Sequence, residues 1–328
     1  MPHQTPTPRP SVEDVRGYLT ELSNWGRWGE GEEGLAGTLN LITPERRAAA
    51  AALAHDGVTV SLGIPLKFAE GQEGRDEQGH LVVGSSPYPV HFALERERME
   101  QAAPGRRVST FDGFLIQPHG QLITHLDAPC HTYVDGTFFN GVPAEGAFTE
   151  DSALVGSVDM VADGIVGRGV LLDVPGSQGR DWLEDDEAVM PEDLDRAASW
   201  AEVEVRPGDC VYVRTGYRGR ALYQLRTGAD YRRPGVQAAC LPWLREHDVA
   251  LLATDVPTDC FPHEYGEVGF PIHTVGMWAI GLWLVDNCLL EAVAAHARAV
   301  GRHEFLSVIA PLVIPGGTGS PVNPLAMF

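Results

Sequence analysis

Short apolar runs bounded by turn residues alternate along this chain with stretches of helical pattern. Such runs lie at 169–174, 210–216, 249–255 and 304–314. The segment PEDLDRAASW (191–200), between the first two, has helical spacing. This alternation favours a sheet that helices cover on its faces, and so predicts an α/β fold around a mixed sheet. Because we find no internal repeat and no linker in 328 residues, we expect one domain over residues 11–328.

The N-terminal region carries the first clear helix signal. Residues 1–10 are rich in proline and threonine, so we expect a disordered tail there. Ser11 with Asp14 three positions later is the pattern of a capping box. The sequence therefore predicts a helix from Ser11 to about Ser23.

A second helix is predicted by residues at both of its ends. Thr43 is a suitable N-cap, Pro44 suits the first turn, and Gly57 would end the alanine-rich body. The segment TVSLGIPL (59–66) has the composition of a strand. The polar, glycine-rich residues 69–87 then predict a long loop that could cover a pocket.

Composition limits the partners and the compartment. Twenty-four basic against 45 acidic residues give a net charge of −21, which would repel nucleic acid and anionic membranes. No stretch approaches the roughly 18 apolar residues of a membrane span, and the N-terminus lacks a signal peptide, so we expect a cytoplasmic protein. The five cysteines are odd in number and show no CxxC spacing, which indicates free thiols.

The segment HGQLITHLDAPCH (119–131) gathers residue types that bind metals. If 119–127 is a strand, Leu122 and Leu126 face the core, because successive strand residues point to opposite sides. The other face then carries His119, Gln121, Ile123, His125 and Asp127. The alternative is a set of unrelated core or surface histidines, but the shared face favours a metal site.

His125 and Asp127 are two residues apart and can converge on one cation, since imidazole nitrogen and carboxylate oxygen both ligate zinc. His119 is farther away, because six extended residues span about 20 Å. It joins the site only if the chain bends, and Gly120 permits a bend. We therefore expect a site in which His119 depends on a turn at Gly120.

The residues after this strand suggest a catalytic histidine. Pro129 should end the strand pairing, and Asp135-Gly136 should form a hairpin turn. His131 would then lie at the edge of the cluster, where a histidine can act as general acid or base. Cys130 could be a thiol nucleophile, but a buried structural cysteine is the favoured interpretation.

In the register of residues 121–131 the chain resembles the metal-dependent cyclase family, which includes kynurenine formamidase-like and isatin hydrolase-like amidohydrolases. The family motif is His-x-Gly-Thr-His-x-Asp-x-Pro-x-His, and five of its seven specified positions match. The resemblance to the longer bacterial branch extends from residues 24–47, through FFNG (138–141), to GTGSPVNPLAMF (317–328). It implies a single α/β domain of the swivelling β/β/α type that associates as a homodimer or homotetramer.

The resemblance also implies a set of site residues. Gln121 stands where the family has its first metal histidine, so the first ligand is His119, which we favour, Gln121 through its amide oxygen, or missing altogether. His273 and Asp286 are the best matches to the ligands that complete the site with His125 and Asp127. Aromatic residues of the N-terminal region shape the family's pocket. The resemblance thus gives Trp25 and Trp28 a possible substrate-stacking role, with packing anchors as the alternative.

These residues predict a hydrolase. A divalent metal, zinc or manganese, would make hydroxide available at neutral pH for attack on a small, aromatic amide, lactam or ester. His131 would be the general acid and base, and the bond broken would be a C–N bond other than a peptide bond. The alternatives are a cyclase or lyase acting on a polyketide-like or aromatic intermediate, and a non-catalytic binding protein that has lost the metal site.

Overall fold

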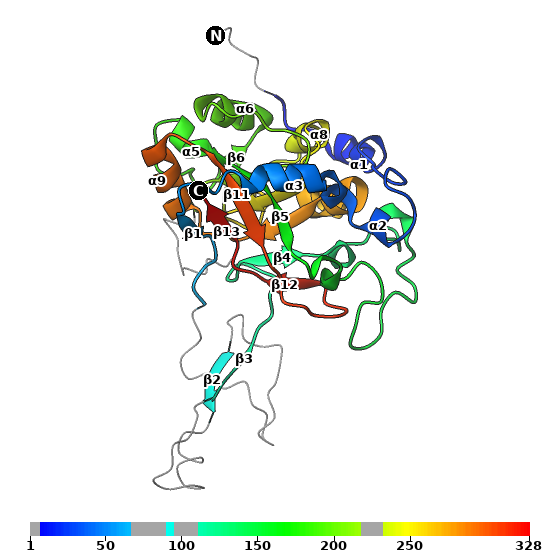
Figure 1. Cartoon of the computed structure of the whole chain (residues 1–328). Coiled ribbons are helices and arrows are strands. Elements are labelled where there is room, and N and C mark those ends of the chain that lie inside the picture. Colours follow the sequence, from blue (N-terminus) through cyan, green and yellow to red (C-terminus); the bar gives the residue numbers. More distant parts are fainter. Residues whose placement is uncertain (1–6, 67–89, 95–110, 218–231) are drawn as a thin grey trace, which may run out of the picture.

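A mixed sheet of nine strands organises the chain. The computed structural model describes residues 7–66, 90–94, 111–217 and 232–328 (Figure 1). In their order across the sheet, the strands are β1 (Thr59–Ser61), β13 (Leu325–Met327), β11 (Glu304–Ile309), β5 (Ile165–Asp173), β7 (Cys210–Arg214), β9 (Leu251–Thr254), β10 (Trp283–Asp286), β4 (His125–Asp127) and β12 (Gly319–Pro321). The central strands β5, β7, β9 and β10 pair in parallel, and the outer pairs are antiparallel.

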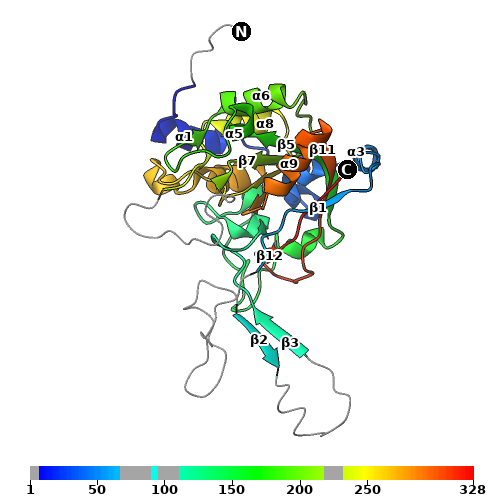
Figure 2. The same ribbon diagram turned by 90° about the vertical axis from the view of Figure 1, so that its left-hand side faces the viewer.

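Two small sheets accompany the large one. Strands β2 (Val90–Leu94) and β3 (Phe111–Leu115) form an antiparallel ribbon that extends away from the large sheet (Figure 2). Strands β6 (Ala188–Val189) and β8 (Gly235–Val236) form a short parallel pair.

Helices connect these strands. The helices are α1 (Val12–Glu21), α2 (Glu32–Leu35), α3 (Pro44–Ala51), α5 (Val174–Ser177), α6 (Pro191–Trp200), α8 (Cys240–Glu246), α9 (Glu291–Val300) and the π-helical η6 (Ile272–Ile280). Short 3-10 turns occur at η1 (Gly37–Leu41), η2 (Pro129–His131), η3 (Phe139–Gly141), η4 (Val158–Val161) and η5 (Gly266–Val268). Within the described residues, no helix combines the length and the apolarity that a membrane span requires.

The central strands are apolar on both faces because each face is covered. In β5, Val170 and Leu172 pack into the core beneath α1, α6, α8 and η6, whereas Leu171 packs into the core beneath α9. In β7, Val211 packs into the first of these cores and Tyr212 packs into the second. Continuous apolar runs are the expected sequence of such strands. The predicted α/β fold around a mixed sheet is therefore confirmed.

The predicted helix starts are confirmed, and one helix end is wrong. The Ser11 side chain and Asp14 form the capping box of α1, and Thr43 caps α3 through the backbone amide of Arg46. Helix α3 ends at Ala51 and not at Gly57. The chain already turns before that glycine, because the Asp56 amide donates to the C-terminal Phe328 carbonyl and leads into β1.

Several predicted strands are shorter in the structure. Of the strand expected at 59–66, only Thr59–Ser61 form a strand, β1, which pairs with β13 over three residues. The strand expected at 304–314 ends at Ile309. The loop predicted at 69–87 lies outside the described residues, as do residues 1–6. Residues 7–10 form no helix or strand, and Arg9 lies 2.6 Å from Glu264, so disorder of the tail stays a prediction.

His303 is a buried histidine away from the cluster, between α9 and β11. Its ring meets the Trp200 ring edge-on with centroids 5.0 Å apart, and neither ring nitrogen makes a hydrogen bond within the described part of the chain. Burial lowers the pKa of His303, and the attraction of Asp173 does not offset this. The folded protein therefore holds His303 uncharged where the unfolded chain would begin to protonate it.

We predict that His303 makes folding sensitive to mild acid. As pH falls through about 6.5, the unfolded chain binds a proton that the folded state excludes, so the free energy of unfolding decreases. His303→Phe keeps an aromatic ring and cannot titrate. Urea unfolding at about pH 7.5 and about pH 5 should show a smaller loss of stability in H303F than in the parent. An equal loss in both would remove His303 from the acid response.

Candidate metal centre

Strand β4 places two cluster residues on one side of the sheet. His125 lies opposite Asp286 of β10, and Asp127 lies opposite Gly319 of β12. Leu126, between them, is fully buried in the core on the other side. The side chains of His125, Asp127 and Asp286 therefore reach the same place because pairing of β4 with β10 brings distant parts of the chain together.

His119 reaches this place because the chain bends. The predicted strand over 119–127 is wrong before residue 125: residues 119–123 form bends, and Gly120 has a φ of +125°. The Asn287 side chain donates to the carbonyls of Gly120 (2.7 Å) and Ile123 (3.1 Å) and holds the bend. His119 Nδ1 lies 2.8 Å from Asp127 Oδ1, so the bend predicted at Gly120 is present.

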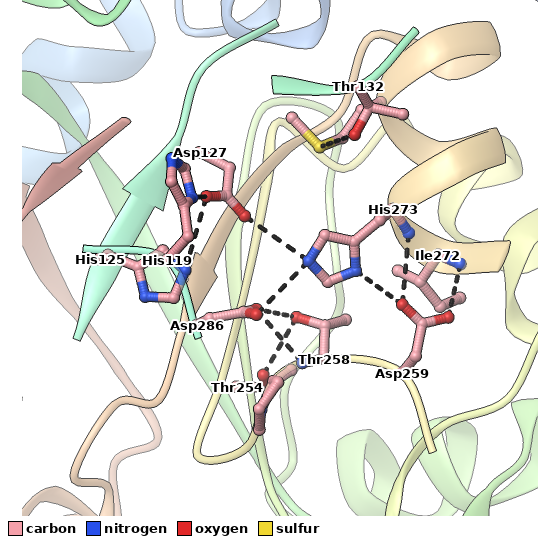
Figure 3. Close-up of polar contacts among 12 residues, drawn as sticks. His119, His125, Asp127, Thr132, Thr254, Thr258, Asp259, Ile272, His273 and Asp286 are labelled. Atoms are coloured by element: carbon pink, nitrogen blue, oxygen red, sulfur yellow. Dashed lines mark hydrogen bonds and ion pairs between the residues drawn. The ribbon is translucent and has the colours of Figure 1, made fainter. Parts of the chain in front are cut away.

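The bend changes which residues face the site. Ile123 was expected on the same face as the histidines, but it is buried and does not line the cavity described below. Its carbonyl has a different use, since His125 Nδ1 donates to it at 2.8 Å. This bond leaves His125 Nε2, 3.5 Å from Asp127 Oδ1, as the nitrogen that faces the cluster (Figure 3).

His273, from η6, enters from the opposite side. Its Nδ1 donates to Asp259 Oδ2 at 2.6 Å, and its Nε2 lies 3.5 Å from Asp127 Oδ2 and 3.4 Å from Asp286 Oδ2 (Figure 3). A carboxylate that fixes one ring nitrogen and leaves the other for a cation is a common support of metal-binding histidines. Asp259 therefore orients His273, a role that the sequence did not reveal.

Asp286 is oriented in the same manner. The Thr258 amide donates to Asp286 Oδ1 at 3.2 Å, and the Thr258 hydroxyl donates to the same oxygen. Asp286 Oδ2 then faces His273 Nε2. Asp127 is fully buried, and its Oδ2 makes no hydrogen bond among the described residues. Two imidazole nitrogens and two carboxylates thus converge, with one carboxylate oxygen lacking a hydrogen-bond donor.

These groups fit a divalent metal. His125, Asp127 and Asp286 each offer one ligand atom, and these atoms lie within 4.8 Å of one another. The same holds for His119, Asp127 and His131, so Asp127 belongs to both groups. Nitrogen and oxygen ligands without sulfur suit zinc or manganese. Asp127 Oδ2, buried without a hydrogen bond, is the atom that a cation would satisfy.

The protonation of the cluster follows from its contacts. Burial opposes ionisation of Asp127, but the nearby imidazoles of His125, His119 and His273 hold the pKa of Asp127 well below its usual range. Burial likewise opposes protonation of His273, but Asp286 and Asp127 outweigh it and raise the pKa of His273 well above its usual value. Burial opposes ionisation of Asp286 too, yet His273 lowers its pKa.

His131 lies at the edge of the cluster, as predicted. Its ring stacks on His119, with centroids 3.9 Å apart and planes 8° apart, and its centroid is 6.5 Å from that of His273. Burial and the neighbouring imidazoles lower the pKa of His131 to about 4 against the attraction of Asp127. Cys130 is buried, which raises its pKa to about 12 and leaves no thiolate nucleophile at neutral pH.

The hairpin after His131 is present as a tight turn. Val134 and Thr137 exchange two backbone hydrogen bonds of 2.9 Å across Asp135-Gly136. Both turn residues have positive φ, 46° and 75°, as a two-residue hairpin turn requires. The predicted hairpin turn therefore follows His131 directly in the chain.

A cavity of about 330 Å³ opens onto the cluster. The sequence-predicted residues that line it are His119, Gln121, His125, Asp127, His131, His273 and Asp286. Further lining residues are Gly120, Thr132, Arg233, Pro257, Phe270 and Thr274. No spacing pattern linked Arg233 or Phe270 to the histidine motif, so sequence reasoning missed them.

Trp25 and Trp28 do not line this cavity. The Trp25 indole N–H donates to the Trp278 carbonyl at 2.8 Å, and the two indole rings meet with centroids 4.4 Å apart. Trp28 lies against the Arg27 guanidinium, 4.9 Å from the ring centroid. These contacts favour the packing interpretation, and the substrate role of both residues stays a prediction.

Comparisons with known proteins agree with this architecture. A family model described as "Putative cyclase" matches residues 60–258. A crystal structure of a novel cyclase is 29% identical, with a TM-score of 0.80 over 94% of this chain and 100% of that chain. Isatin hydrolase A from Labrenzia aggregata, bound to benzyl benzoate, is 21% identical, with a TM-score of 0.59 over 85% and 97% of the two chains. Isatin hydrolase A from Ralstonia solanacearum is 21% identical, with a TM-score of 0.56 over 85% and 95%. A comparison with curated proteins gives no match.

We predict that Asp259→Asn weakens metal binding by about 10- to 100-fold, because it loosens the orientation of His273. Affinity is measured by competition with a chromogenic chelator for Zn²⁺ and Mn²⁺. Asp173→Asn is the matched control, since Asp173 is also a buried aspartate but pairs with Arg214 and Arg298. Unchanged affinity in D259N would show that Asp259 does not support the site.

A second pair of variants tests the first ligand. His119 contacts Asp127 directly, so His119→Ala should lower the bound metal, whereas Gln121→Ala should largely keep it. Metal per protein is measured by elemental analysis after dialysis against buffered metal. If Q121A lost its metal and H119A kept it, Gln121 would be the first ligand. If both variants kept their metal, His125, Asp127, His273 and Asp286 would hold it without either residue.

Proposed function

The chain belongs to the cyclase family, and from that premise we propose that it is a metal-dependent hydrolase of a small aromatic amide, lactam or ester. The observation that carries the proposal is the convergence of His125 Nε2 and His273 Nε2 on the carboxylates of Asp127 and Asp286 at one end of a cavity. Similarity to isatin hydrolases supports a lactam fused to an aromatic ring as one substrate type. The bond broken would be a C–N bond outside peptides.

In this proposal one group of residues binds the metal, and His131 transfers protons. His125, Asp127, His273 and Asp286, with His119, would hold a divalent metal, which when bound would supply a Lewis acid for the substrate carbonyl and lower the pKa of water towards neutral. His131 lines the same cavity and would take a proton from the attacking water. The same imidazole would then protonate the leaving nitrogen or oxygen.

The walls of the cavity suit a small aromatic substrate. Phe270 lines the cavity, and its ring centroid is 6.3 Å from that of His273, so a flat ring could lie against it beside the metal ligands. A volume of about 330 Å³ is at the small end for a ligand pocket. This size favours one or two fused rings over a long chain.

We predict that His131→Ala keeps the metal and lowers turnover by about 10²- to 10⁴-fold, the range for loss of a general acid or base. Turnover is measured with N-formyl anilines, isatin-like lactams and simple lactones on protein loaded with Zn²⁺ or Mn²⁺. His55→Ala, at an exposed histidine, is the control.

Two results would contradict this assignment. Loss of metal in H131A would make His131 a ligand, and normal turnover would remove it from proton transfer. If the parent binds metal but hydrolyses none of these compounds, the residues serve a cyclase or lyase instead. If the parent binds no metal, the protein is a binding protein.

A further inference from the structure

Arg233 is a buried cation in the wall of the cavity. It is 4% exposed, lies just before β8, and lines the same cavity as the metal cluster. Its Nη1 donates to the carbonyl of Pro257 at 2.7 Å and to the carbonyl of Asp259. Its Nε makes no hydrogen bond to any described residue. Among the described residues, no carboxylate forms an ion pair with this guanidinium.

An unpaired buried guanidinium calls for an explanation. Arginine stays protonated in proteins, and burying its charge without a counter-ion is unfavourable. The carboxylate of Asp259, whose backbone carbonyl accepts from Arg233, is already used: it accepts from His273 Nδ1 (2.6 Å) and from the Ile272 amide (2.7 Å). Carbonyl oxygens hold the guanidinium in place but do not neutralise it.

The backbone fixes Arg233 relative to the metal cluster. The amide of Arg233 donates to the Phe261 carbonyl at 2.9 Å, and the Phe261 amide donates back at 3.1 Å. Segment 257–261 therefore carries both the carbonyls that hold Arg233 and the side chains of Thr258 and Asp259. Those side chains orient Asp286 and His273. One segment thus sets the position of the cation and of two candidate metal ligands.

The charges around the cavity are unevenly distributed. Its carboxylates belong to the metal cluster, and among the described residues that line it Arg233 is the one arginine or lysine. Phe270 and Pro257 supply apolar surface. A ligand that contacts the metal cluster and Arg233 at once needs a polar group at each end and an apolar body between them.

We propose that Arg233 binds a carboxylate on the substrate, away from the bond that is hydrolysed, so that the preferred substrates are anionic aromatic amides or lactams. This inference rests on the proposed function. The guanidinium presents planar N–H donors that match a carboxylate, and hydrogen bonds between two charged groups are about twice as strong as neutral ones. A neutral substrate of the same shape would leave the Arg233 charge uncompensated.

The test compares two substrates of equal shape, N-formyl-3-aminobenzoate and N-formyl-3-aminobenzamide, together with their 2-substituted isomers. The parent should prefer the carboxylate substrates in kcat/KM. Arg233→Met removes the charge with little change in volume and should reduce this preference by about tenfold or more. Arg233→Lys keeps the charge and should retain part of the preference.

A purely structural role of Arg233 would look different. Loss of its bonds to the carbonyls of Pro257 and Asp259 would disturb His273, so R233M would lose metal affinity and would slow both substrates equally. That result, or an equal preference in the parent and R233M, would overturn the proposal. The metal affinity of R233M is therefore measured in the same experiment.

A binding measurement separates this inference from the proposed hydrolysis. Benzoate and benzamide are titrated calorimetrically into chelator-treated protein, where no metal can hold the carboxylate. The parent should bind benzoate more tightly than benzamide, and R233M should lose the difference. If the parent shows no difference, Arg233 does not bind carboxylates. If the difference is present but no compound is hydrolysed, the proposed function fails and the binding role of Arg233 stands.

Discussion

The centre of this protein depends on one buried carboxylate. Asp127 is fully buried on a three-residue strand between β10 and β12, and it contacts imidazoles from three parts of the chain: His119, His125 and His273. A carboxylate without water is stable only when positive charge or donors surround it. These histidines therefore stabilise Asp127, and their arrangement around its two oxygens leaves Oδ2 without a hydrogen bond from any described residue. The burial of the Asp127 carboxylate among imidazoles therefore creates a site that fits a cation.

The surrounding structure holds these ligands through groups that never face the cavity. The Ile123 carbonyl sets the ring of His125, Asp259 sets that of His273, and the Asn287 side chain holds the bend that delivers His119. The first two contacts fix which ring nitrogen faces Asp127, and the third places His119 beside it. The large sheet supplies the rigidity, because its central strands are buried on both faces. The fold thus directs the imidazoles of His119, His125 and His273 towards Asp127.

The similarity to other proteins bears on the scaffold more than on the substrate. The novel cyclase structure covers nearly this whole chain at 29% identity, and the isatin hydrolases share the fold at 21%. At such distances the chemistry of the cavity wall can change while the metal ligands stay. Arg233 and Phe270 lie in that wall and come from outside the histidine motif. We therefore expect residues of the cavity wall, and not the candidate metal ligands, to determine which substrate is preferred.

The amino-acid sequence by itself determined the local structure and the chemical types of the site. Apolar runs set β5, β7 and β9, Ser11 and Thr43 set two helix starts, and the order of residues 119–131 placed metal-binding types close together, because these features depend on neighbours in the chain. Only the tertiary structure decided that residues 119–123 bend, that Ile123 turns into the core, and that Asp259 and Arg233 join the site. These outcomes come from contacts between separate segments of the chain, such as Asn287 with Gly120, β10 with β4, and Asp259 with His273. No spacing along the chain predicts such pairings.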